Sequence, residues 1–132
     1  MTGKEASMFM LGLAVAAGGA LGALLRWGAS CLLNGFGPIP FGTLAVNLAG
    51  GFLIGVLVVY FSEARHLDQT LYLFLVTGCL GALTTFSTFS AENVSMLMNG
   101  LYLKSLAHAS LHLFGSFAMT ALGMHAAKAF LS

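Results

Sequence analysis

Charge is the scarcest property of this sequence. Lysine and arginine together number five and aspartate and glutamate four, so charged residues make up 7% of the 132 residues, against 58% hydrophobic residues. Soluble domains carry about 25% charged residues, because their surfaces face water. The scarcity of charge excludes a typical water-soluble domain and indicates a chain that lies within a membrane.

Features that carry enzyme or nucleic-acid chemistry are also few. The two cysteines, Cys31 and Cys79, lie in apolar surroundings without CxxC spacing, so they indicate neither a disulfide framework nor a metal site. No P-loop or dinucleotide-binding motif is present. A net charge of +1 gives no basic patch for nucleic acid. We therefore expect no enzyme activity and no nucleic-acid partner.

Long apolar stretches are what the sequence has in place of charge. Four can be drawn, at about residues 8–33, 41–61, 70–99 and 105–131. Each has the ~20 residues that a helix needs to cross a ~30 Å hydrocarbon core. The first is too long for a signal peptide and lacks a strong basic flank, so we expect it to stay in the mature protein. The sequence predicts an all-α membrane protein, a single domain over 1–132 with four transmembrane helices.

The few cationic residues are divided almost evenly between the two sides of such a bundle. With four spans, Lys4, Arg65 and Lys128 fall on one side, whereas Lys104 and Arg26 fall on the other. The positive-inside rule therefore gives only a weak orientation. Insertion in both orientations would allow two copies to pair as an antiparallel homodimer. A single orientation with weak signals fits the charges equally well.

Glycines at a spacing of four mark two helix faces. Gly18 and Gly22 lie in the first stretch, and Gly51 and Gly55 lie in the second. Small residues at this spacing let helix backbones approach closely, so we expect both pairs to lie at packing seams. Arg26 continues the face of the first pair, where it suits either an anchor at the membrane interface or contact with an ion.

Polar side chains recur every four residues in the last stretch. His108, His112, Ser116 and Thr120 drift by only about 40° per step around a helix, so they form one slowly winding stripe. Several weak sites in a row suit a moving ion, although hydrogen bonding between helices gives the same pattern. A metal site at the two histidines is disfavoured, because no third ligand stands near them in sequence.

The second stretch carries two polar residues on one face. Thr43 and Asn47 are four apart. The neutral Asn47 amide can donate two hydrogen bonds to an anion, which avoids the cost of a buried charge. It can equally bind a neighbouring helix.

The densest polar run of the chain lies in the third stretch. Residues 84–90 read TTFSTFS, with five hydroxyl side chains in seven positions, and they follow the glycines Gly78 and Gly81. This composition predicts a break in the third helix. Unwound backbone at membrane depth is tolerated where it is buried in protein or lines an ion site, and its free carbonyls can hold a cation such as Na⁺.

Two aromatic rings and one carboxylate accompany this run. Phe86 and Phe89 are three apart, and a phenyl ring has a positive edge that can face an anion, although such a pair is also typical of core packing. Glu92 is the only carboxylate expected within a span, where it must pair or form hydrogen bonds.

These segments resemble a known family. GGALGALLR (18–26), GTLAVNLAGGFLIG (42–55) and GCLGALTTFSTFSAE (78–92) are similar to the corresponding segments of the CrcB/Fluc fluoride channels, and the likeness covers essentially the whole chain. The resemblance implies a fluoride-selective channel of the bacterial inner membrane, built as an antiparallel, dual-topology homodimer. It also implies two pores and a structural Na⁺ at the dimer centre, and passive export of cytoplasmic fluoride.

The resemblance assigns roles residue by residue. Phe86 and Phe89 match the phenylalanines whose ring edges line the fluoride path, Asn47 matches the pore asparagine that hydrogen-bonds the ion, and Arg26 matches the vestibule arginine. Gly81 and Thr84 match the positions whose carbonyls hold Na⁺. The remaining expected pathway residues are polar side chains of the second, third and fourth helices: Thr43, Ser87, Thr88, His108, His112, Ser116 and Thr120. The two histidines stand where some relatives carry tyrosine or serine.

A small proton-coupled, dual-topology exporter of the multidrug type is the alternative function. Such an exporter needs a titratable carboxylate in the membrane, and Glu92 is the only candidate. It lies beside the TTFSTF run instead of early in the first helix. A subunit without transport activity would leave the polar stripe unexplained.

Overall fold

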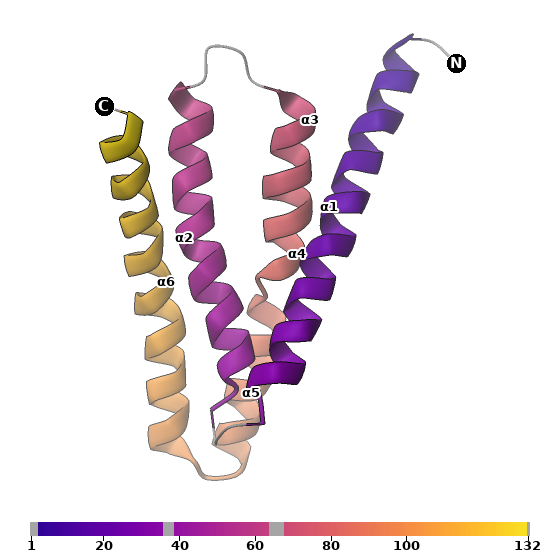
Figure 1. The fold of residues 1–132 in the computed structure, drawn as a ribbon. Helices are drawn as coiled ribbons and strands as arrows, with labels where there is room; N and C mark the ends of the chain where they lie inside the picture. The colour runs from indigo at the N-terminus through magenta and orange to yellow at the C-terminus, as the bar shows by residue number, and fades with distance from the viewer. Residues whose placement is uncertain (1–2, 36–38, 64–67, 132) are drawn as a thin grey trace.

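The computed structural model describes residues 3–35, 39–63 and 68–131, and the regular structure in these ranges is entirely helical. Arg65, one of the five cationic residues, lies outside the described residues. The described helices form four long legs. The legs run up and down alternately, so the start of α1 and the end of α6 lie at the same end of the bundle (Figure 1). In chain order the elements are α1 (Gly3–Leu33), α2 (Phe41–Glu63), α3 (Gln69–Tyr72), η1 (Leu73–Leu80), α4 (Gly81–Leu83), α5 (Phe86–Met98) and α6 (Tyr102–Leu131). The third leg consists of α3, η1, α4 and α5, and the other three legs are α1, α2 and α6.

Three legs are both long and apolar enough to cross a membrane, namely Lys4–Leu33, Phe41–Glu63 and Gln69–Met98. The fourth predicted span forms a helix of 30 residues, α6. It is long enough to cross a membrane, but it is not among the segments that are also apolar enough. Its polar stripe lowers its hydropathy. α6 nevertheless lies parallel to α2 and at the same level of the bundle (Figure 1).

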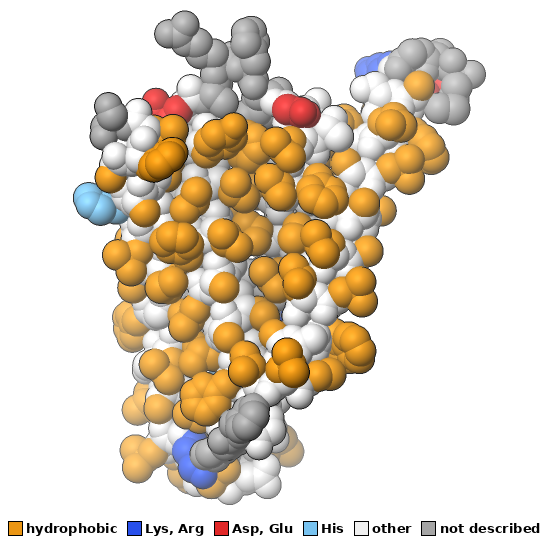
Figure 2. Space-filling model, in the orientation of Figure 1, with side chains coloured by type: hydrophobic (Ala, Val, Ile, Leu, Met, Phe, Trp, Pro, Cys, Tyr) orange, Lys and Arg blue, Asp and Glu red, His pale blue; other side chains and the backbone are white. Residues whose placement is uncertain are grey.

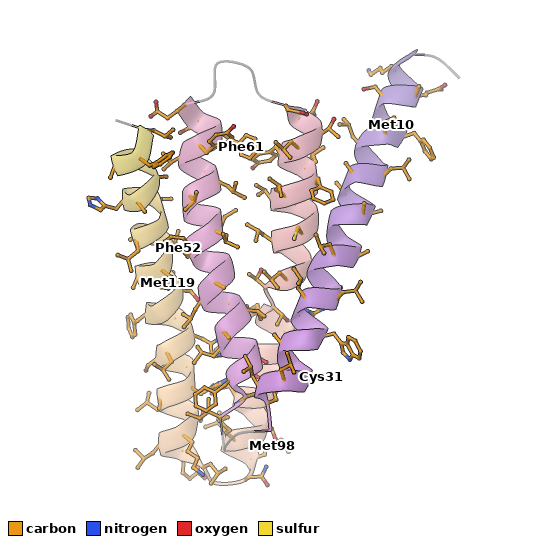
Figure 3. The ribbon with its side chains drawn as sticks, in the orientation of Figure 1. Met10, Cys31, Phe52, Phe61, Met98 and Met119 are labelled. Carbon is orange, nitrogen blue, oxygen red and sulfur yellow. The ribbon has the colours of Figure 1, made fainter. Side chains whose placement is uncertain are left out.

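The outer surface confirms the membrane assignment. Hydrophobic side chains cover almost the whole visible face, and charged side chains gather near its two ends (Figure 2). Met10, for example, projects outward from α1 and is 61% exposed (Figure 3). At the same end of the bundle Phe61 of α2 packs edge-on against Tyr72 of α3, with ring centroids 5.2 Å apart. An apolar exterior of this extent is stable in lipid and not in water.

Glycines allow the close approach of two helix pairs, as the spacing predicted. A Cβ atom at Gly18 or Gly22 of α1 would collide with backbone carbonyls of η1, those of Phe74 and Cys79. A Cβ atom at Gly55 of α2 would collide with the Thr120 carbonyl of α6. These seams fix α1 against the third leg and α2 against α6, because only glycine leaves room for direct backbone contact.

The third leg contains the predicted break. α4 ends at Leu83, and the next two residues are extended, Thr84 with φ −79° and ψ 153° and Thr85 with φ −152° and ψ 120°. The Thr85 hydroxyl then caps α5 by accepting a hydrogen bond from the Thr88 N–H at 3.1 Å. The π-helical turn η1 just before the break was not predicted. Wide turns of this kind are often found at functional sites.

Candidate functional site

Asn47 of α2 holds the broken segment in place. Its Oδ1 accepts a hydrogen bond from the Thr85 N–H at 2.8 Å, and its Nδ2 donates to the Thr85 carbonyl at 3.0 Å. This reciprocal pair satisfies both backbone groups of an extended residue at membrane depth, where no water is at hand. The second Nδ2 hydrogen points at His112 Nδ1, 3.1 Å away. Both amide hydrogens are therefore engaged within the chain.

The same hydrogen bonds release two backbone carbonyls. In an unbroken helix the Gly81 carbonyl would accept from the Thr85 N–H, but that donor is bound to Asn47. The Thr84 carbonyl would accept from the Thr88 N–H, but that donor is bound to the Thr85 hydroxyl. Gly81 is also exposed on the surface of the bundle. Oxygen atoms of this type are the ligands that hard cations prefer, so the two positions fit the expected Na⁺ ligands.

An open cavity of about 640 Å³ lies beside the break. It brings together residues from α2, the third leg and α6 that the sequence had singled out separately. Among those that line it are Asn47, Gly81, Thr84, Phe86, Phe89, His112 and Ser116. Most of the remaining lining is apolar, with Leu80, Leu113 and Phe117 among it. The cavity is thus a mainly apolar space with a few polar groups in its lining, as small-ligand sites usually are.

Four aromatic rings form a continuous cluster beside the cavity, and three of them, Phe86, Phe89 and His112, line it. The Phe89 ring stacks on His108 with centroids 5.3 Å apart and approaches His112 at 4.6 Å. Phe86 lies 5.5 Å from Phe89 and is 79% exposed. The stacked imidazole lies over one face of Phe89, and the positive ring edge is the part of the ring that attracts an anion.

Behind the rings lies a buried polar network. The Thr43 hydroxyl donates to Glu92 Oε1 at 2.6 Å, and His108 Nε2 lies 3.5 Å from Glu92 Oε2. On its other side His108 Nδ1 contacts Asn93 Oδ1 at 3.3 Å, and the same oxygen accepts from Ser105 at 3.1 Å. Thr43 and His108 are almost fully buried. The network therefore holds Glu92 and His108 in fixed positions next to the cavity wall.

Sequence reasoning missed Asn93 and Ser105 and left Glu92 without a partner. Glu92 and Asn93 lie in α5, whereas Ser105 and His108 lie in α6. The pairing depends on how the turn after α5 folds α6 back against it, which no local spacing encodes. The sequence could indicate only that Glu92 needs a partner, because a carboxylate within a transmembrane span must pair or form hydrogen bonds.

The contact with Asn47 fixes the proton of His112. The Asn47 orientation is set by its two bonds to Thr85, so its amide nitrogen must donate to His112 Nδ1. The neutral ring then carries its proton on Nε2. This Nε2 is buried and has no hydrogen-bond partner among the described residues. The site therefore offers an unused N–H donor next to the cavity.

Comparison with known proteins identifies the family to which this chain belongs. The family described as "CrcB-like protein, Camphor Resistance (CrcB)" matches residues 13–124. The chain belongs to the CrcB-like family. Proteins named "Fluoride-specific ion channel FluC" from Burkholderia cenocepacia, Burkholderia lata and Burkholderia pseudomallei are 51%, 49% and 48% identical to it over 126 residues. These residues are 95% of this chain and 98% of each relative.

Membership confirms that this CrcB-like protein is a multi-pass membrane protein and not an enzyme. The remaining expected site residues are not among those that line the cavity. Ser87 is exposed, Thr88 bonds the Thr85 hydroxyl at 3.1 Å, and Thr120 lies beside Gly51 in the α2–α6 seam. Arg26 lines a separate, smaller pocket of about 260 Å³, whose lining residues all belong to α1.

Proposed function

We propose that this CrcB-like protein is a channel that conducts fluoride passively out of the cell, as the names of its relatives suggest. The observation that carries the proposal is the cavity wall at the helix break. There Phe89, Ser116 and His112 line one space without a cationic side chain among the lining residues, and the buried His112 Nε2–H has no hydrogen-bond partner among the described residues. Neutral donors of this kind replace the hydration shell of a small anion without binding it too tightly to leave.

The mechanism requires only positioned donors along a narrow path. Fluoride sheds water against the ring edges of Phe86 and Phe89, accepts from the His112 Nε2–H, and passes to the hydroxyl of Ser116. Asn47 acts by orienting His112 and by fixing the break. Thr120, one turn beyond Ser116 on α6, continues the track. Thr43 and His108 support the wall through Glu92, and Ser87 and Thr88 lie at the first turn of α5.

A second copy of the chain completes the site. Phe86 and Gly81 are exposed at the break in the isolated chain, but unwound backbone at membrane depth must be covered by protein or line a water-filled space. An antiparallel homodimer supplies this cover and agrees with the even division of the cations. In it the released carbonyls of Gly81 and Thr84 from both copies would hold a structural Na⁺, a neutral-ligand site that fixes the two breaks against each other.

A spin-label distance measurement tests the dimer and the ion together. With Cys31→Ser as background and a nitroxide at Lys128→Cys, an antiparallel pair places the labels on opposite membrane faces, about 40 Å or more apart. We expect this distance in sodium buffer and a broadened distribution when sodium is omitted throughout purification. A short distance would show a parallel pair, and the absence of any coupling would show a monomer. An unchanged distribution without sodium would remove the ion from the proposal.

Efflux from proteoliposomes tests the function. We expect reconstituted protein to release trapped fluoride rapidly once valinomycin supplies a balancing potassium current, at a rate that does not depend on a proton gradient. Chloride-loaded vesicles serve as the control and should retain their contents. Transport of an organic cation driven by a pH gradient would instead show the exporter. No flux of either kind would contradict both functions.

A further inference from the structure

Three side chains next to the cavity have buried atoms without a hydrogen-bond partner. Among the described residues these atoms are Glu92 Oε2, His108 Nε2 and His112 Nε2, and the only other one of this kind is Arg26 Nε. One possible ligand atom from each of Glu92, His108 and His112 lies within 4.8 Å of the others. The two histidines are 0% and 5% exposed. Buried polar atoms without a hydrogen bond are costly, and the 3.5 Å between His108 Nε2 and Glu92 Oε2 is too long for a strong one, so this cluster favours an occupant.

We propose that Glu92, His108 and His112 form a binding site for a divalent transition metal ion such as Zn²⁺. Two imidazoles and one carboxylate are the donor set that such ions prefer over Mg²⁺ or Ca²⁺. His108 Nε2 and Glu92 Oε2 are already 3.5 Å apart, close to the spacing of two ligands on one tetrahedral zinc ion. The sequence alone disfavoured a metal here, because it showed no third ligand; the fold supplies Glu92 from α5.

The surrounding hydrogen bonds suit metal binding at two of the three ligands. His108 Nδ1 faces Asn93 Oδ1, which holds the proton on that nitrogen and directs the Nε2 lone pair toward Glu92. Thr43 donates to the other Glu92 oxygen and fixes the carboxylate. Both ligands thus have the outer contacts by which proteins orient metal-binding groups.

The third ligand couples the metal to the anion path. If His112 Nε2 binds a metal ion, the ring proton must lie on Nδ1. There it faces the donor group of the Asn47 amide, 3.1 Å away, and the hydrogen bond between them is lost. His112 can therefore donate to an anion or bind a metal ion, but not both at once. A metal ion bound by His112 would also lie next to the cavity. It follows, if the proposed channel function holds, that zinc blocks fluoride conduction.

Zinc titration of the tag-free protein in detergent tests the site without reference to transport. We expect saturable binding by calorimetry, and Co²⁺ should give the intense visible bands of a tetrahedral complex. Glu92→Gln and His112→Ser should each weaken zinc binding by ~100-fold or more, since even outer contacts are worth 10- to 100-fold. The control is His125→Ala, an exposed histidine of the same helix, which should bind zinc as the unchanged protein does. Equal binding in Glu92→Gln and His112→Ser, or no saturable binding and no cobalt bands in the unchanged protein, would overturn the site. The cobalt spectrum of the unchanged protein tests the metal site even if the variants fail to fold.

Fluoride efflux with and without zinc gives the second readout. Zinc should slow efflux through the unchanged protein and through His125→Ala, and a chelator should restore it. Zinc binding in a protein that passes no fluoride would leave the metal site standing and contradict the channel. Fluoride flux with no zinc binding would contradict the metal site alone.

Discussion

Phe89→Leu is expected to slow fluoride efflux by roughly 30-fold, because leucine fills a similar space but has no polarised ring edge. The Phe89 ring stands between Phe86 and the two histidines, with centroids 5.5 Å from Phe86 and 4.6 Å from His112. A contact to an anion is worth about 2 kcal/mol, within the range of hydrogen bonds to charged groups, and about 1.4 kcal/mol corresponds to a factor of ten.

The matched control is Phe114→Leu in α6. Phe114 is 65% exposed and does not line the cavity, so the same change of side chain should leave efflux within about twofold of the unchanged protein. Initial rates from vesicles with equal protein content give the comparison. Equal efflux in the two variants would mean that Phe89 packs the core of the bundle without contacting the ion.

The helices and the break could be predicted from the sequence, because each depends on local composition. Apolar length indicated the legs, and the glycines Gly78 and Gly81 before a run of hydroxyl residues indicated where the third leg is interrupted. The helix of the fourth leg was predicted, but its low hydropathy was underrated: His108, His112, Ser116 and Thr120 make α6 less apolar than the other three. α6 is assigned as a transmembrane span because it packs along α2, and not because of its hydropathy.

The partners of the polar residues could not be predicted, because they depend on contacts between helices that are distant in sequence. Asn47 was expected to donate to the ion, yet its amide binds the Thr85 backbone 38 positions away and His112 65 positions away. Glu92 similarly receives the Thr43 hydroxyl from another helix. Spacing on one helix identifies a polar face but not what lies opposite it.

Asn47→Asp is expected to abolish measurable fluoride conduction, with a loss of roughly three orders of magnitude. Aspartate keeps the oxygen that accepts from the Thr85 N–H, so the break retains one of its two bonds. It loses the donor to the Thr85 carbonyl and to His112. A negative charge about 4 Å from the path repels an anion by about 4 kcal/mol at an effective dielectric constant of 20.

The same substitution reverses the proton position of His112. A carboxylate facing Nδ1 accepts a hydrogen bond, so the neutral ring places its proton there and leaves Nε2 without one. The fluoride donor is lost, whereas the carboxylate–histidine arrangement favours a metal on Nε2. We therefore expect Asn47→Asp to lower fluoride efflux while it strengthens zinc binding, measured on one preparation. Asn99→Asp, which adds the same charge at the exposed end of α5, should change neither. Efflux within threefold of the unchanged protein would show that Asn47 neither orients His112 nor lies near the ion.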